Sequence, residues 1–78
     1  MNLITVQSSN ISQIGFEENQ SITLNQKPRN VLRVVFANGL IYDYYGVDKN
    51  TFDDFLNSES KGKFLHSNIA KQYPYEKI

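Results

Sequence analysis

The residues best suited to chemistry in this sequence lie at Ser60-Lys61-Gly62-Lys63, where a helix is predicted to begin. A serine and a glycine at a helix start leave backbone amides directed outward, and the helix dipole favours an anion there. Lys61 or Lys63 could close over a phosphate or a carboxylate, and Lys71 adds a positive charge further along. Most helix starts bind no anion, so a plain N-cap followed by a glycine is the competing interpretation.

Aromatic rings could add stacking surfaces for a nucleobase to this anion site. The chain has five tyrosines, of which Tyr42 and Tyr73 are the candidates for ligand binding. The alternative is that they fill the core, because aromatic residues at strand period in a small domain usually do so. His66 is predicted to be an exposed histidine on the helix face opposite Ile69, and not a catalytic base.

The sequence contains few residues in patterns typical of catalysis, metal binding or cofactor binding. Ser8 and Ser9 have no histidine near them in sequence, and the single histidine cannot build a metal site alone. The Asp53-Asp54 pair lies beside apolar core positions without a second acidic cluster, and no phosphate-binding loop or dinucleotide fingerprint is present. We therefore expect no enzymatic activity, no metal and no cofactor.

Composition bounds the protein further. A length of 78 residues predicts one domain over 1–78 with a small core. The formal net charge of zero argues against mainly electrostatic binding of duplex nucleic acid. The segment 48–59 is acidic and the segment 60–78 is basic, which is also typical of two solvated helix faces. The absence of cysteine makes a cytoplasmic location the simpler expectation. No segment approaches the roughly 20 apolar residues of a membrane span, so no membrane partner is expected.

The elements that position these residues are organised around a β-hairpin predicted over Val31–Tyr45. A two-residue turn at Asn38-Gly39 would leave Asp43 on the apolar face of the first strand. A three-residue loop ending in a left-handed Gly39 instead pairs Asp43 with Arg33 and gathers one apolar face. We predict the second register, because a slip of one residue would exchange the buried and exposed sets.

The other face of the hairpin still carries the apolar side chains of Val35 and Ile41. They need a cover, either from another segment of the chain or from a second subunit. Because a short chain buries little core, we expect a homo-oligomer with contacts through Val35, Ile41 and Tyr45.

Shorter elements flank the hairpin. Strands are predicted at Leu3–Val6 and Ile14–Phe16, and Glu17–Asn30 is either a long loop or an irregular edge strand. Asp48 is the predicted N-cap of a first helix, and a second helix runs from near Ser60 or Gly62 to Gln72. The tail either frays or packs Tyr75 and Ile78 against the sheet. The fold class is α+β, a small antiparallel sheet of three to four strands followed by two C-terminal helices.

Six short motifs in this order resemble the KTSC domain pattern and cover nearly the whole chain. They are Ser8-Ser9-Asn10-Ile11 with Ile14-Gly15-Phe16, Leu32-x-Val34-x-Phe36-x-Asn38-Gly39, Tyr42-x-Tyr44-x-x-Val47, Ser60-x-Gly62-x-Phe64, Ile69, and Tyr73-Pro74-Tyr75-x-Lys77-Ile78. This family comprises small modules at the C-terminus of some lysyl-tRNA synthetases and stand-alone proteins of bacteria and phages. The resemblance implies RNA binding, a role suggested for the family.

The sequence departs from that pattern at several positions. Asp48 replaces a usual proline, which costs little because either residue suits a helix start. Leu65-His66 replaces an aromatic residue followed by asparagine. Ala70 occupies the place of a frequent basic residue, which weakens any phosphate-binding role there, although Lys71 is adjacent.

Two functions from different classes follow from the residues and the resemblance. The first is a non-enzymatic binding module for RNA or a nucleotide, and neutral net charge favours a small nucleotide or a short single strand over a duplex. Its predicted ligand-binding residues are Ser60, Lys61, Gly62, Lys63, Lys71, Tyr42 and Tyr73. In a phage, such a module would suit the sequestration of a nucleotide signal of host defence. The second function is a protein-interaction or assembly module that uses the exposed sheet face.

Overall fold

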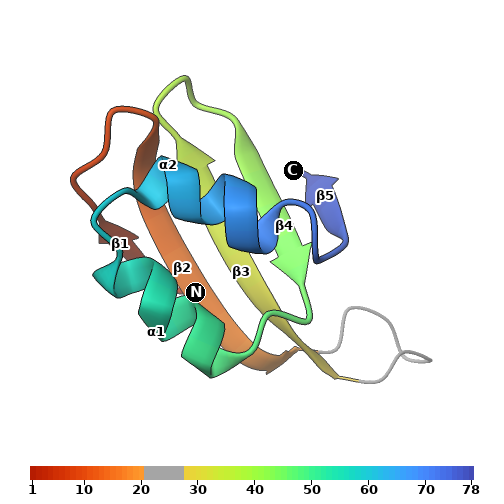
Figure 1. Cartoon of the computed structure of the whole chain (residues 1–78). Helices are drawn as coiled ribbons and strands as arrows, with labels where there is room; N and C mark the ends of the chain where they lie inside the picture. The colour runs from red at the N-terminus through yellow and green to blue at the C-terminus, as the bar shows by residue number, and fades with distance from the viewer. Residues whose placement is uncertain (21–27) are drawn as a thin grey trace.

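The computed structural model describes residues 1–20 and 28–78, which form one antiparallel sheet with helices on one face (Figure 1). The sheet has five strands in sequence order, one more than the upper end of the prediction: β1 (Leu3–Thr5), β2 (Ile11–Gln20), β3 (Arg29–Phe36), β4 (Ile41–Tyr45) and β5 (Tyr75–Lys77). The helices are α1 (Lys49–Asn57) and α2 (Lys61–Phe64), and α2 continues into the π-helical segment η1 (Leu65–Ile69). The α+β class is confirmed.

The predicted hairpin register is confirmed between β3 and β4. Arg33 pairs with Asp43, and Val34 pairs with Tyr42. At the turn, the Phe36 N–H donates to the Leu40 carbonyl at 2.8 Å, and Gly39 has a φ of 92°. This left-handed residue closes the three-residue loop.

β1 matches the strand predicted at Leu3–Val6, whereas the C-terminal strand and the full length of β2 were not defined by the sequence. The tail packs against the sheet as β5, which pairs with β4 through Tyr44 and Tyr75, and does not fray. β2 is longer than the predicted Ile14–Phe16 because its pairing with β3 extends from Ile11 to Gln20. Part of the predicted loop or strand at Glu17–Asn30 therefore belongs to β2 and β3, and its middle, 21–27, lies outside the described residues.

Side-chain caps start both helices. Asp48 Oδ1 accepts from the Thr51 N–H at 2.7 Å. Hydrogen bonding from the Thr51 side chain, and then from this N–H, holds the pKa of Asp48 below its usual value. Ser60 caps α2. Helical structure ends at Ile69, three residues before the predicted end, and the chain continues as a turn in which the Gln72 and Tyr73 N–H groups both donate to the Ile69 carbonyl at 3.1 Å. No helix in the described part of the chain is long and apolar enough to cross a membrane.

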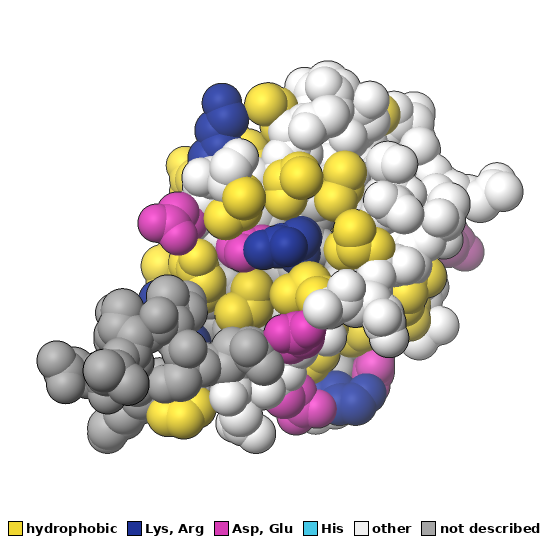
Figure 2. Space-filling model, turned by 180° about the vertical axis from the view of Figure 1, so that it is seen from behind, with side chains coloured by type: hydrophobic (Ala, Val, Ile, Leu, Met, Phe, Trp, Pro, Cys, Tyr) yellow, Lys and Arg dark blue, Asp and Glu magenta, His cyan; other side chains and the backbone are white. Residues whose placement is uncertain are grey.

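The core lies between the sheet and the helices. The inward faces of β2, β3 and β4 meet the apolar faces of α1 and η1 in one cluster, formed by Ile11, Ile14, Leu32, Val34, Tyr44, Val47, Phe52, Phe55, Leu65 and Ile69. Phe16 stacks on Phe52 with ring centroids 4.7 Å apart. This packing fixes the helices over one face, and within residues 1–20 and 28–78 no helix covers the other face of the sheet (Figures 1 and 2).

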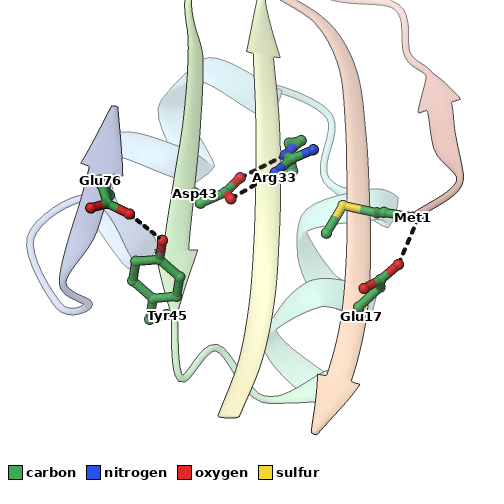
Figure 3. Close-up of polar contacts among 6 residues, drawn as sticks. All are labelled: Met1, Glu17, Arg33, Asp43, Tyr45 and Glu76. Carbon is green, nitrogen blue, oxygen red and sulfur yellow. Dashed lines mark hydrogen bonds and ion pairs between the residues drawn. The ribbon is translucent and has the colours of Figure 1, made fainter. Parts of the chain in front are cut away.

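The open face of the sheet carries apolar side chains around a central ion pair (Figure 2). Arg33 donates to both carboxylate oxygens of Asp43, at 2.8 and 2.9 Å (Figure 3). Val35 and Ile41 are half-buried on this face, and β1 is an edge strand and not a layer over them.

Tyr45 is buried in the single chain, so it is not the exposed contact residue that the sequence predicted. The residue is only 8% exposed, and the Arg29 guanidinium lies 4.2 Å from its ring centroid. Its hydroxyl donates to Glu76 at 2.8 Å (Figure 3). Long-range pairing of β4 with β5 brings Glu76 to this position.

Tyr45 provides a test of this packing by pH titration. Burial, and then the hydrogen bond to Glu76, raise the pKa of Tyr45 from 10.0 to about 12. A raised folded-state pKa stabilises the fold fully below the unfolded value, and this contribution is lost as pH rises through the folded value. We expect ultraviolet titration to show a last phenol ionising near pH 12 that is absent from Tyr45→Phe and retained in Tyr73→Phe. A last step that persists in Tyr45→Phe would contradict the assignment.

Candidate ligand-binding groove

Two adjoining cavities form a groove between the β1–β2 loop, the β3–β4 turn and the second helix. The hairpin-end cavity has a volume of about 620 Å³ and the serine-end cavity about 490 Å³. Four residues line both cavities and mark their junction: Ser9, Asn10, Gly62 and His66.

The hairpin-end cavity has apolar and amide-bearing walls. Its apolar lining comes from strands and helix together, namely Ile11, Phe36, Ala37, Tyr44, Leu65 and Ala70. Asn10 and Asn38 add polar groups. Apolar surface with a few polar groups is typical of small-molecule sites.

The serine-end cavity is polar. Beyond the junction residues it is lined by Ser8, Ser60, Lys63 and Ser67. With Ser9, this gives four hydroxyl groups and one ammonium group around a single cavity. Hydroxyl and ammonium groups are hydrogen-bond donors to anionic oxygens.

A tight turn at the end of the β1–β2 loop positions the shared wall. Ser8 Oγ accepts from the amides of Asn10 and Ile11 at 3.2 and 3.3 Å. The Asn10 carbonyl accepts from the Ala37 N–H at 2.9 Å, which ties the loop to the hairpin. A Cβ atom at Gly62 would lie 3.2 Å from Asn10 Nδ2, so glycine permits the close approach of this helix to the loop.

The start of α2 differs from the predicted row of outward amides. The Lys63 N–H donates to Ser60 Oγ at 3.4 Å, and the Phe64 N–H donates to the Ser60 carbonyl at 3.0 Å. These two amides therefore have partners within the chain. The capping part of the sequence interpretation is confirmed, and anion binding stays a prediction that rests on side chains.

The structure separates the two lysines of the predicted motif. Lys61 Nζ donates to the Ser58 carbonyl at 2.6 Å and so connects the end of α1 to α2, whereas Lys63 is exposed and lines the serine-end cavity. Lys71 is exposed in the turn after η1 and lines neither cavity. Of the predicted motif, Ser60, Gly62 and Lys63 come together at the groove.

Neither of the two predicted stacking tyrosines lines a cavity of the groove. Tyr42 is half-buried among aromatic rings, with centroid distances of 5.5 Å to both Phe36 and Tyr75. Tyr73 packs against the core cluster. Tyr44 and Phe36 line the hairpin-end cavity in their place.

Sequence reasoning missed Asn10, Asn38 and His66 as groove residues. The pairing of Ile11 with Phe36 places the Ser8–Asn10 turn beside the β3–β4 turn, and the order of strands was needed to see this. His66 is exposed, as predicted, but it lies at the junction of the two cavities.

The charge of the groove restricts its ligand. Lys63 and His66 line it, and no aspartate or glutamate is among the residues that line the two cavities. No group of three histidine, cysteine, aspartate or glutamate side chains in residues 1–20 and 28–78 is placed to hold a metal ion. The groove therefore suits a neutral or anionic ligand with an apolar part.

Fold and groove together define a small α+β domain with a one-sided helical layer and a surface groove at one end of the sheet. The KTSC domain family model matches residues 7–73, so the chain belongs to the KTSC domain family. A crystal structure of a KTSC domain protein from Yersinia pestis is similar, with a TM-score of 0.79 and 28% sequence identity over 99% of this chain and 96% of that chain. Comparison with curated proteins gave no match.

Proposed function

We propose that this KTSC domain binds RNA or a nucleotide in the groove and does not transform it. The observation that carries the proposal is the pairing of an apolar, amide-rimmed cavity with a polar cavity that holds Lys63 and four serines. A nucleotide unit combines a flat, largely apolar base with an anionic phosphate. A short single strand or a free nucleotide matches the groove and the zero net charge better than a duplex does.

Binding without catalysis is supported by the polar contacts of the groove. A nucleophilic serine needs an adjacent base within hydrogen-bond reach. Ser8 and Ser60 accept hydrogen bonds from backbone amides, and in the described residues no hydrogen bond joins His66 to a serine. The serines therefore serve the turn, the helix cap and the cavity wall.

Charge reversal at Lys63 tests the site. We expect Lys63→Glu to weaken binding of the strongest ligand among AMP, GMP, CMP, UMP and single-stranded hexanucleotides by about tenfold, measured by calorimetry at low salt. Charge reversal at Lys61 would also break its hydrogen bond to the Ser58 carbonyl and could lower stability. The single Lys63 variant therefore tests the effect of charge on binding without this effect on stability. Added salt should weaken binding with a shallow slope, because few phosphates are engaged.

Lys71→Glu is the matched control, because it makes the same charge change on an exposed residue outside both cavities. It should change the affinity less than about twofold, since separated exposed charges are largely screened. Equal losses in the two variants would show that only net charge matters, and the groove would be rejected as the site.

The open sheet face supports assembly as a second candidate function. Val35 and Ile41 lie beside polar groups that are already paired within the chain, Arg33 with Asp43 and Tyr45 with Glu76 (Figure 3). Such a face can meet a second copy without leaving these groups unpaired.

Light scattering after size-exclusion chromatography tests the assembly. We expect a mass of twice the chain's 9.0 kDa at high protein concentration, and a single-chain mass for Ile41→Lys, which places a charge on the apolar face. Lys77→Glu, an exposed change on the edge strand β5, should keep the larger mass. A parent protein that keeps the single-chain mass at high concentration would contradict the assembly hypothesis.

A further inference from the structure

The groove is largely apolar at the hairpin end and polar at the serine end, and this polarity determines how a ligand can lie in it. We propose that it is a site for one nucleotide unit bound in a fixed direction, with the base in the hairpin-end cavity and the phosphate in the serine-end cavity. This inference rests on the proposed function and assigns its ligand class and orientation.

The hairpin-end cavity has the groups that a base requires. The half-buried ring of Phe36 offers apolar surface to a face of the base, and the largely buried Tyr44 and Leu65 complete the apolar lining. Asn38 Oδ1 accepts from the Leu40 N–H at 3.1 Å, which orients the side chain and leaves its two N–H donors for a ligand. Asn10 adds a second amide on the same rim, and side-chain amides carry the donors and acceptors that read base edges.

The serine-end cavity has the groups that a phosphate requires. A serine hydroxyl that accepts from a backbone amide retains its own O–H as a donor. Ser8 and Ser60 are in this state, and Ser9, Ser67 and the Lys63 ammonium line the same cavity. No carboxylate among the lining residues opposes the negative charge.

The junction of the two cavities offers polar groups to the part of the ligand that links base and phosphate. His66, Ser9 and Asn10 line both cavities, so the linking sugar would lie against polar groups there. Gly62 leaves this passage without a side chain of its own, beside Asn10 Nδ2. A free mononucleotide and the phosphorylated end of an RNA strand share this chemistry.

Dividing the nucleotide into its halves tests the orientation by calorimetry. The tightest of AMP, GMP, CMP and UMP should bind at least about tenfold more strongly than its nucleoside or than ribose 5-phosphate. Lys63→Gln should weaken nucleotide binding by several-fold, less than Lys63→Glu does because the serine hydroxyls remain, and leave nucleoside affinity within about twofold. Asn38→Ala should weaken nucleoside and nucleotide alike and leave ribose 5-phosphate unchanged. Lys71→Gln is the matched control for Lys63→Gln.

Each outcome decides a separate point. If Lys63→Gln weakens the nucleoside as much as the nucleotide, or if Asn38→Ala weakens ribose 5-phosphate, the orientation is overturned while nucleotide binding stands. If no nucleotide, nucleoside or hexanucleotide binds, the proposed function fails together with this inference. If the orientation holds, the affinities of a 5′-phosphorylated hexanucleotide and of the mononucleotide are compared. Tighter binding of the hexanucleotide identifies an RNA end as the ligand, and tighter binding of the mononucleotide identifies the free nucleotide.

Discussion

Replacing Phe55 by alanine is expected to remove a large part of the folding free energy of this domain. Phe55 is fully buried between the helices and the sheet and stacks on Phe64 with ring centroids 5.6 Å apart. Truncation of a buried phenylalanine costs about 3–5 kcal/mol, against a total stability of about 5–10 kcal/mol for a domain of this size. Thermal unfolding followed by circular dichroism should show a melting temperature at least about 12 °C lower than that of the parent.

Asp54→Ala is the control for that experiment, because Asp54 is the exposed neighbour of Phe55 on α1. Alanine favours a helix more than aspartate does, so this variant should melt within a few degrees of the parent. A Phe55→Ala protein that melts together with Asp54→Ala would mean that the α1 contact with the sheet is not the core of the fold.

The central hairpin and the helix starts could be predicted because their signals are local. Alternation of apolar residues, a glycine in the turn and opposite charges at Arg33 and Asp43 allowed one register to be chosen. Asp48 and Ser60 precede helical patterns, and each accepts a backbone amide as an N-cap.

The C-terminal edge strand and most of the groove could not be predicted because they depend on long-range pairing. The segment Tyr75–Lys77 is too short and too polar to be predicted as a strand from its sequence. It forms a strand because it pairs with the free edge of β4. Asn10 and Asn38 are distant in sequence and lie on one rim only after β2 pairs with β3. The role of Lys61 depends on where α1 ends, since its partner is the Ser58 carbonyl.

The same distinction explains why the tyrosine that lines the groove differs from the two predicted. A strand pattern shows which tyrosines share a face, and the packing of neighbouring elements decides which rings line the groove. Tyr75 of β5 packs against both Tyr42 and Tyr44, with ring centroids 5.5 and 5.7 Å apart, and of these two only Tyr44 lines a cavity of the groove. Charge and hydroxyl groups at α2 were visible in the sequence, but the apolar half of the groove was not.

Replacing Gly39 by valine is expected to destabilise the protein through the backbone alone. Gly39 has a φ of 92°, and a Cβ atom at this position would meet no atom within 4 Å, so no steric clash contributes. A β-branched residue held at positive φ costs about 1–3 kcal/mol, and the three-residue turn offers no other conformation that keeps the register of β3 and β4. The melting temperature should fall by about 5–15 °C.

Gly39→Asn distinguishes backbone strain from loss of the turn sequence, because asparagine adopts left-handed conformations more readily than other non-glycine residues. The expected order of stability is Gly39, then asparagine, then valine, with the asparagine variant closer to the parent. The hairpin also carries Asn38 and Phe36 at the rim of the groove, so the valine variant should lose ligand affinity as the turn distorts. A valine variant that melts within a degree or two of the parent would show that the bulged turn does not fix the register of this sheet.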